Sequence, residues 1–383
     1  MGINEIILYG MLGFMVWAAV DKFFLGGRFG YGAKFDEAFA AMGPLALAIV
    51  GIMCFAPVLS QLLTPLAAPL FRAFRADPAM LAGSILASDM GGYALAAQMT
   101  GDAQVRVLSG IFLGSTLGVT VIFTIPYTAT VIEAADRPYL SKGVLAGIIP
   151  IPFCSLLSGL MSGMPLTMLL PNLLPAALLA VVLALALWRF PAGTTKVFTW
   201  FSRLVSLGIG LTLVVAILQA LTPLTLIPGM AAIEDQFITV GMIAIVLAGA
   251  YPFIHFITSV CRRPLLALGR RIGVDATCVA GMLASLASSI PMYPMVKDMT
   301  PRGKTMAIAF AVCAGFCLGD FLGFTSANEP AYIFPMIVGK LLGGVAGACI
   351  AARMVPAQGD APGWQESPRL MPMETAVLRK ATR

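Results

Sequence analysis

Charged residues are scarce in this chain. Only 11% of its 383 residues are Asp, Glu, Lys or Arg, whereas 59% are hydrophobic. A soluble protein of this length would need far more charge to cover its surface. The long apolar runs therefore predict an all-α polytopic membrane protein surrounded by the lipid bilayer.

Signatures of other classes are missing too. The chain has one histidine, no Walker A motif and no Cys or His set with metal-ligand spacing, so we expect no enzyme and no cofactor. The seven cysteines lie mostly inside apolar segments and show no disulfide spacing. The net charge of +6 does not indicate nucleic acid, because the Lys and Arg residues cluster between apolar runs. His255 is expected to be structural or interfacial.

Eleven apolar segments are present. They lie near residues 3–20, 44–71, 79–99, 107–132, 143–163, 166–188, 201–222, 237–258, 276–296, 305–328 and 331–354. If all eleven crossed the membrane, the loop Lys and Arg would divide 11 to 12 between the two sides, and the positive-inside rule would have nothing to act on.

Two re-entrant hairpins give a clear orientation. With segments 79–99 and 276–296 entering and leaving on one face and the N-terminus outside, 20 Lys and Arg lie inside and 3 outside. Making only 276–296 a hairpin, with the N-terminus inside, gives 19 to 4, so charge alone does not separate the two topologies.

An internal repeat favours the two-hairpin topology. Residues 114–120 read GSTLGVT and residues 319–325 read GDFLGFT, while LASD at 86–89 matches LASS at 286–289. Matching segments should behave alike, so the chain is expected to hold two inverted repeats with hairpins and broken helices meeting at midplane. The expected divisions are a repeat at 3–163, a linking helix and basic loop at 164–199, a second repeat at 200–354 and a polar cytoplasmic tail at 355–383.

The hairpin sequences would interrupt a helix. Two glycines follow Asp89, and Pro291 and Pro294 follow Ser289. Non-helical backbone at membrane depth survives only where protein or a water-filled cavity satisfies it. The alternative of a kinked spanning helix stays open.

Polar residues inside the apolar runs predict a site. A lone carboxylate at the centre of a membrane helix costs roughly 2.5 to 3.5 kcal/mol, so Asp89 and Asp320 need a cavity, a partner or a cationic ligand. Lys340 lies about ten residues into its segment and either snorkels or pairs with one of these acids. Glu329 is expected in a solvated turn. Possible ligand contacts near the acids are the hydroxyls, amide and rings of Ser88, Ser289, Thr325, Asn328, Tyr93, Tyr293 and Phe324.

Several strings resemble a known family. LASDMGGY at 86–93, GVLAGIIPIP at 143–152, LGDFLGF at 318–324, IFPMIVGKLLGG at 333–344 and the opening MGINEII are similar to those of the ethanolamine-utilisation permease family, EutH. The similarity runs from residue 1 to about 355. One departure is Phe321, where the resemblance leads us to expect a histidine in many relatives, so any role of that imidazole in proton coupling is in doubt here.

The resemblance implies a bacterial inner-membrane transporter that imports ethanolamine, with the N-terminus outside and the C-terminus cytoplasmic. Alternating access around a site holding the acids and their polar neighbours is the expected mechanism. A carrier of another small amine or polar solute, a sodium site, and a membrane scaffold recruiting ethanolamine-degrading enzymes are the alternatives. The sequence leaves open whether the chain forms a homo-oligomer and whether transport is coupled to an ion.

Overall fold

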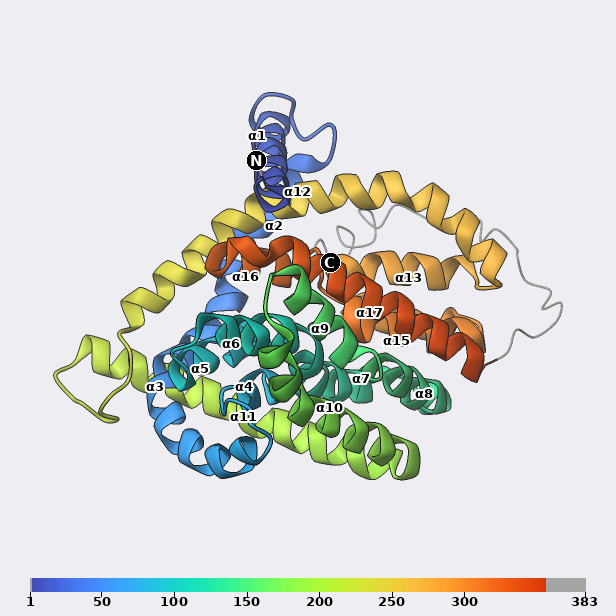
Figure 1. Ribbon diagram of the computed structural model, residues 1–383. Coiled ribbons are helices and arrows are strands. Elements are labelled where there is room, and N and C mark those ends of the chain that lie inside the picture. Colours follow the sequence, from blue (N-terminus) through green and yellow to red (C-terminus); the bar gives the residue numbers. More distant parts are fainter. Residues whose placement is uncertain (1, 356–383) are drawn as a thin grey trace.

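The computed structural model describes residues 2–355, apart from the side chains of residues 261–263, 265–268 and 270–272. All regular structure in this range is helical, as the sequence predicted (Figure 1). The elements are α1 (Ile3–Phe23), α2 (Tyr31–Ala40), α3 (Met42–Ala73), α4 (Met80–Ile85), η1 (Ser88–Met90), α5 (Gly92–Met99), α6 (Ala103–Val107), η2 (Leu108–Gly118), η3 (Thr120–Thr124), α7 (Ile125–Val131), η4 (Ala134–Asp136), α8 (Arg137–Ile148), α9 (Ile151–Met161), α10 (Leu166–Arg189), α11 (Pro191–Leu221), α12 (Ile233–Ile272), α13 (Ala276–Ala287), α14 (Met292–Met295), η5 (Val296–Asp298), α15 (Pro301–Ala314), α16 (Asp320–Asn328), η6 (Pro330–Tyr332) and α17 (Ile333–Met354). The predicted tail at 355–383 lies, but for its first residue, outside the described residues.

Eight stretches of the described chain are long and apolar enough to cross a membrane. Large apolar side chains on these helices, such as Leu66, Leu211 and Phe153, are more than two-thirds exposed. Such surfaces are unfavourable in water and match the hydrocarbon of a bilayer. The protein is therefore a multi-pass membrane protein.

Two apolar segments are interrupted where the sequence predicted breaks. Segment 79–99 forms the short helices α4 and α5, with η1 between them and Gly91 at a φ of +93°. Segment 276–296 forms α13 and the single turn α14, which begins directly after Pro291. Glycine adopts positive φ without steric cost, and proline removes a backbone N–H and disfavours helical geometry at the residue before it, so local chemistry favours both breaks.

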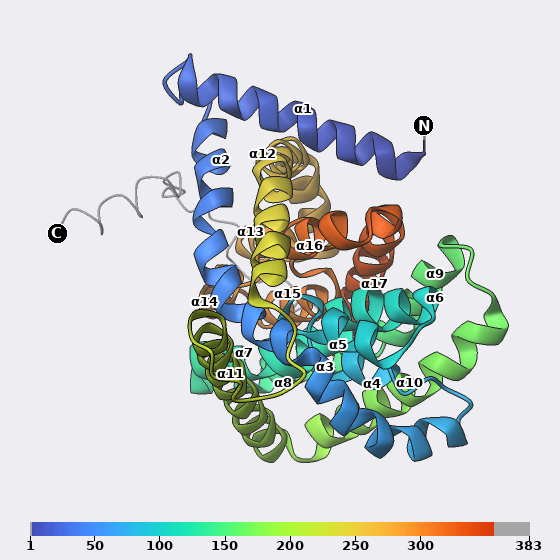
Figure 2. The ribbon, with the colours of Figure 1, turned by 90° about the vertical axis from the view of Figure 1, so that its left-hand side faces the viewer.

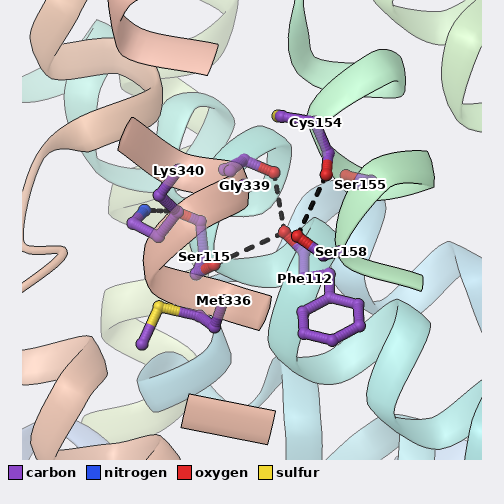
Figure 3. A pocket seen from close by; sticks show the side chains of 9 residues that line it. Phe112, Ser115, Cys154, Ser155, Ser158, Met336, Gly339 and Lys340 are labelled. Carbon is purple, nitrogen blue, oxygen red and sulfur yellow. Dashed lines mark hydrogen bonds between the residues drawn. The ribbon is translucent and has the colours of Figure 1, made fainter. Parts of the chain in front are cut away.

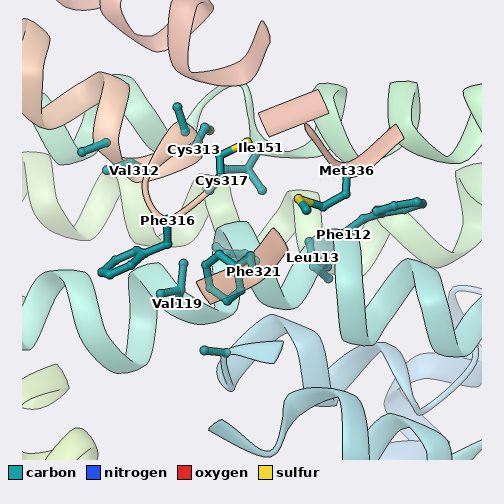
Figure 4. Close-up of a cluster of buried hydrophobic side chains, with 14 of the residues drawn as sticks. Phe112, Leu113, Val119, Ile151, Val312, Cys313, Phe316, Cys317, Phe321 and Met336 are labelled. Carbon is teal, nitrogen blue, oxygen red and sulfur yellow. The ribbon is translucent and has the colours of Figure 1, made fainter. Parts of the chain in front are cut away.

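A third break divides α15 from α16 at residues 315–319. Phe316 has a φ of +58°, which is rare for a bulky residue and costs about 1 kcal/mol or more. A Cβ added to Gly319 would lie 1.9 Å from the carbonyl oxygen of Ala287, so only glycine permits this approach. The ring centroids of Phe316, in this break, and Phe321, just after it, lie 6.0 Å apart within the buried cluster that Figure 4 shows in part.

The segment from Ala103 to Val131 stays helical throughout, but its middle is not α-helical. η2 and η3 are π-helices, and nearly all of their side chains are buried. η2 contacts α4, α5, α9, α15 and α17, so it is the central element of the fold. π-Helical geometry is rare in proteins and is frequently found at functional sites.

The connection between the two predicted repeats differs from the expectation. The sequence predicted a basic loop before residue 200, whereas α11 begins at Pro191 and only Phe190 separates it from α10. Proline is favoured in the first turn of a helix, because its missing N–H would have no partner there. The basic residues Lys196 and Arg203 therefore lie on a helix.

The first helix lies at the edge of the molecule. Figure 2 shows α1 across one end, where it contacts α2 and α12. The buried carboxylate of Asp21 accepts hydrogen bonds from the backbone N–H groups of Phe29 (3.0 Å) and Gly32 (2.9 Å). These bonds fix the turn from α1 to α2.

Candidate functional site

Each repeated motif packs against the interrupted segment of its own half. In the second half, the backbone N–H groups of Phe316 and Leu318 donate to the carbonyl oxygens of Ser285 and Leu286, each over 2.8 Å. In the first half, Ser88 Oγ donates to the carbonyl oxygen of Ile111 in η2 over 3.3 Å. Broken backbone is thus hydrogen-bonded to protein rather than exposed to lipid, as membrane depth requires.

The two acids lie at two of these breaks. Asp89 is in η1, and Asp320 is the first residue of α16. η1 contacts α16, and the carboxylate of Asp89 lies within electrostatic reach of Asp320 and of Lys340. The Tyr251 hydroxyl donates to Asp320 Oδ1 over 3.2 Å, whereas no hydrogen bond or ion pair joins the Asp89 side chain to another residue within 2–355. Two carboxylates with so few partners retain the capacity to bind a cation.

Lys340 does not form the direct ion pair that the sequence suggested. The residue is 2% exposed, and its ammonium donates to the carbonyl oxygen of Ser115 and lies 4.6 Å from the centroid of the Phe321 ring. No carboxylate of the described chain lies within 4.0 Å of it. The physical reason is placement: α17 directs this side chain against η2 and the start of α16, and Asp89 acts on it from farther away. Snorkelling to the membrane surface is excluded by its burial.

A small polar pocket lies beside Lys340 (Figure 3). It is enclosed by η2, α9 and α17, and is too tight to admit a water molecule. The hydroxyl of Ser158 donates to the carbonyl oxygens of Cys154 (3.0 Å) and Pro335 (2.9 Å). The hydroxyl of Ser155, by contrast, is buried with no hydrogen-bond partner in the described residues. The pocket lining consists of Phe112, Ser115, Thr116, Cys154, Ser155, Ser158, Met336, Gly339 and Lys340.

Tyr93 and Phe324 meet, but in a different polar environment. Their rings are 5.7 Å apart and edge to face, and the Tyr93 hydroxyl donates to Glu329 Oε1 over 2.8 Å. Arg106 donates to the same oxygen over 2.8 Å. Glu329 is therefore not in the solvated turn expected from the sequence, because the Arg106 ion pair holds its side chain at 14% exposure.

The other predicted contacts are divided between two places. Thr325 is buried on α16 beside the acids, and the Asn328 amide donates to the carbonyl oxygen of Phe324 on the same helix over 2.9 Å. Ser289 and Tyr293 lie instead in the second hairpin, where both hydroxyls are buried without a hydrogen-bond partner in the described chain. Whether any of these side chains contacts a ligand stays a prediction.

Two ion pairs join the two halves at opposite ends of their central segments. Arg106, at the start of the 103–131 helix, pairs with Glu329, which follows α16 (2.8 Å). Asp136, beyond the other end of that helix, pairs with Lys304 near the start of α15 (2.5 Å). The segments Ala103–Val131 and Pro301–Asn328 therefore run in opposite directions past each other.

Sequence reasoning missed Tyr251 and Arg106 as parts of this region. Tyr251 is a hydroxyl-bearing side chain within an apolar run, which is the signal that could have found it. Arg106 has no such signal, because its partner is 223 residues away in the chain.

Eight apolar helical stretches, interrupted segments that carry the partly buried acids Asp89 and Asp320, and two central segments that run in opposite directions define the class as a polytopic helical membrane protein. The family model for "Ethanolamine utilisation protein, EutH" matches residues 3–354, so the chain belongs to the EutH family, as the sequence strings suggested.

Named relatives span nearly the whole chain. "Probable ethanolamine permease EutH" of Listeria monocytogenes is 47% identical over 354 residues, which cover 92% of this chain and 95% of the relative. "Uncharacterized protein YxeR" of Bacillus subtilis is 44% identical over 358 residues, covering 94% and 96%. "Probable ethanolamine permease EutH" of Escherichia coli is 41% identical over 398 residues, covering 93% and 96%. No solved structure matches the chain.

Proposed function

We propose that this protein imports ethanolamine across the bacterial inner membrane by alternating access between two inverted repeats. The names of the relatives from Listeria and Escherichia coli support the substrate and the transport role. The division into repeats at residues 3–163 and 200–354 is supported by the paired motifs and by the opposite directions of the two central segments.

The observation that carries the proposal is the approach of Asp89 and Asp320 at two broken membrane segments. Ethanolamine at neutral pH is a small ammonium cation with a hydroxyl group. A buried carboxylate gives an ammonium a charge-assisted hydrogen bond, and an aromatic face adds roughly 0.5 to 2 kcal/mol. The two acids and the nearby Phe321 ring supply both kinds of contact.

The two ion pairs that join the halves suit the gates of such a carrier. We assign the outer gate to Arg106 and Glu329 and the inner gate to Asp136 and Lys304, in accord with the orientation that places most Lys and Arg inside. Both pairs are formed and the nearby pocket is closed, so the conformation fits an occluded state. Opening one pair at a time would expose the acids to one side of the membrane only.

The membrane potential is sufficient to drive uptake. A potential of 100 mV contributes roughly 2.3 kcal/mol per unit charge, equivalent to about 50-fold accumulation of a cation. Uniport of the ammonium form therefore needs no coupled ion.

A carrier for other small ammonium compounds is the second candidate. The acids and the Phe321 ring recognise an ammonium group, whereas no contact described so far distinguishes the hydroxyl of ethanolamine from a methyl group. Competition between ethanolamine and ethylamine decides between these readings.

The test is uptake of labelled ethanolamine into proteoliposomes, with pH, sodium and potential varied separately. We expect uptake that rises with an inside-negative potential and is inhibited by excess unlabelled ethanolamine. Equal inhibition by ethylamine would favour the broader substrate class. Uptake no faster than in protein-free liposomes would refute the transport proposal.

A further inference from the structure

The ammonium of Lys340 fills a position built for a cation. It is held by a backbone carbonyl oxygen, that of Ser115, and by the face of the Phe321 ring. Both contacts are uncharged, and both recognise any small ammonium group, whether on a side chain or a free amine. Asp89 acts on the same ammonium from farther away.

The two repeated motifs build this position together. Ser115 is the second residue of GSTLGVT, and Phe321 is the third residue of GDFLGFT. Asp320, the counterpart of Ser115 in the second motif, directly precedes Phe321. The ammonium of Lys340 therefore lies between the two halves, at the position where the ammonium of the proposed substrate would be bound.

The pocket beside Lys340 offers a second position for the same ammonium only once its walls move apart, because in this conformation it is too tight to admit a water molecule. Lys340 also lines the pocket of Figure 3, into which η2 and α9 bring the hydroxyl groups of Thr116, Ser155 and Ser158. Ser155 is 1% exposed, and its hydroxyl has no partner in the described residues. A buried hydroxyl without a partner is unfavourable, and an ammonium that moved there would supply the missing hydrogen bond.

We infer that Lys340 is a tethered cation that occupies the ammonium subsite of the empty protein, and that the substrate's ammonium displaces it toward Ser155. The inference rests on the proposed function for the identity of the substrate, but the subsite itself concerns any small primary ammonium. The lysine keeps the acidic region near neutrality when no substrate is bound. If the subsite is free in only a fraction of the molecules, the apparent Kd for the ligand equals the intrinsic Kd divided by that fraction.

The experiment measures equilibrium binding of labelled ethanolamine and labelled methylammonium to the purified full-length protein. Lys340→Met removes the competitor and should lower Kd about tenfold, if the lysine holds the subsite in about nine molecules of ten. Lys340→Gln serves if the methionine variant does not fold. Ser155→Ala removes the second position, so it should raise Kd several-fold in the presence of Lys340 and have no effect in its absence.

Ser60→Ala is the matched control. Ser60 is a buried serine on α3 whose hydroxyl bonds the carbonyl oxygen of Pro57, and its loss should leave Kd unchanged. If Lys340 is displaced toward Ser155, the effect of Ser155→Ala on Kd should depend on the presence of Lys340. If Lys340 weakens binding only by repelling the ligand's charge, Ser155→Ala should leave Kd unchanged.

Weaker or unchanged binding of methylammonium by folded Lys340→Met or Lys340→Gln protein would overturn the inference, and so would a Ser155 effect that persists without the lysine. Tight methylammonium binding by these variants, with no ethanolamine binding or uptake by the unmodified protein, would support the subsite and refute ethanolamine as substrate.

Discussion

The two halves of the protein share motifs but place their acids on different elements. In the first half the acid is Asp89, at the hairpin break, and the corresponding position of the second hairpin is Ser289. In the second half the acid is Asp320, at the start of α16, and its counterpart in the first half is Ser115. Each half thus contributes one carboxylate to the region where η1 contacts α16, and in the proposed carrier the two acids would form one asymmetric site.

The two halves also differ in the backbone of their central segments. The 103–131 segment remains helical by adopting π-helical geometry, whereas its counterpart breaks at residues 315–319. The break frees the first turn of α16, where the helix dipole stabilises the negative charge of Asp320. The 103–131 segment has no such terminus, because η2 continues through it.

The largest effect should follow removal of the charge at Asp320. Asp320→Asn should weaken ethanolamine binding about 10- to 150-fold, since one buried charge-assisted contact is worth roughly 1.5 to 3 kcal/mol. Uptake kinetics in proteoliposomes measure the change. Asp298→Asn, which neutralises an exposed acid in the same half, is the control and should leave uptake unchanged. Full activity of the Asp320 variant would remove this carboxylate from the site.

The two ion pairs should control access to the site from opposite sides of the membrane. Glu329→Gln removes the negative charge from the contacts with Arg106 and Tyr93 and should favour opening at the outer end, whereas Asp136→Asn should favour opening at the inner end. Each pair is partly buried, with Arg106 still 32% exposed, so we expect about 1 to 2 kcal/mol, or 5- to 30-fold in the equilibrium.

A cysteine at Thr325, buried on α16 one turn before Glu329, reports the outer opening. In a chain without native cysteines, Glu329→Gln should speed its reaction with an impermeant thiol reagent added outside, and Asp136→Asn should not. Equal acceleration in both variants would contradict the assignment of separate gates.

The sequence was sufficient for features with local causes. Long apolar runs predicted the helices, and the glycines after Asp89 and the prolines after Ser289 predicted two breaks that the structure has. Glycine and proline act on their own backbone, so their effects can be recognised without knowledge of the fold. The π-helical stretch was not predicted, because GSTLGVT contains no residue that forces π-helical geometry.

Contacts between the halves were beyond sequence reasoning. Arg106 and Glu329 were separate charges until folding joined them, and Lys340 was expected to pair with an acid because only charge, and not the carbonyl of Ser115, is visible in a sequence. Phe321 attracted attention only as a departure from the expected histidine. In the structure its ring lies against the Lys340 ammonium.

Tyr251→Phe should have a moderate effect, since the hydroxyl orients Asp320 without contacting the substrate itself. Loss of one hydrogen bond to Oδ1 is worth about 0.5 to 1.5 kcal/mol, so ethanolamine binding should weaken about 2- to 12-fold with little change in thermal stability. Tyr9→Phe, at an exposed position of α1, is the matched control. If the Tyr251 effect persisted in an Asp320→Asn background, the tyrosine would act by another route.

The smallest effect is expected at Ser289, the counterpart of Asp89. Its hydroxyl is buried without a partner in the described residues, so Ser289→Ala removes an unsatisfied polar group and should leave stability unchanged or raise it by about 1 kcal/mol. Uptake should stay normal, because the second hairpin carries no charge where the first carries Asp89. The neighbouring Ser285 donates to the carbonyl oxygen of Met282 over 2.7 Å, so Ser285→Ala should instead lose about 1 kcal/mol. Thermal unfolding of both variants, measured beside ethanolamine uptake, separates the two cases. Loss of uptake in Ser289→Ala protein with normal stability would show that both hairpins contact the substrate, and that the two halves are more alike than their acids indicate.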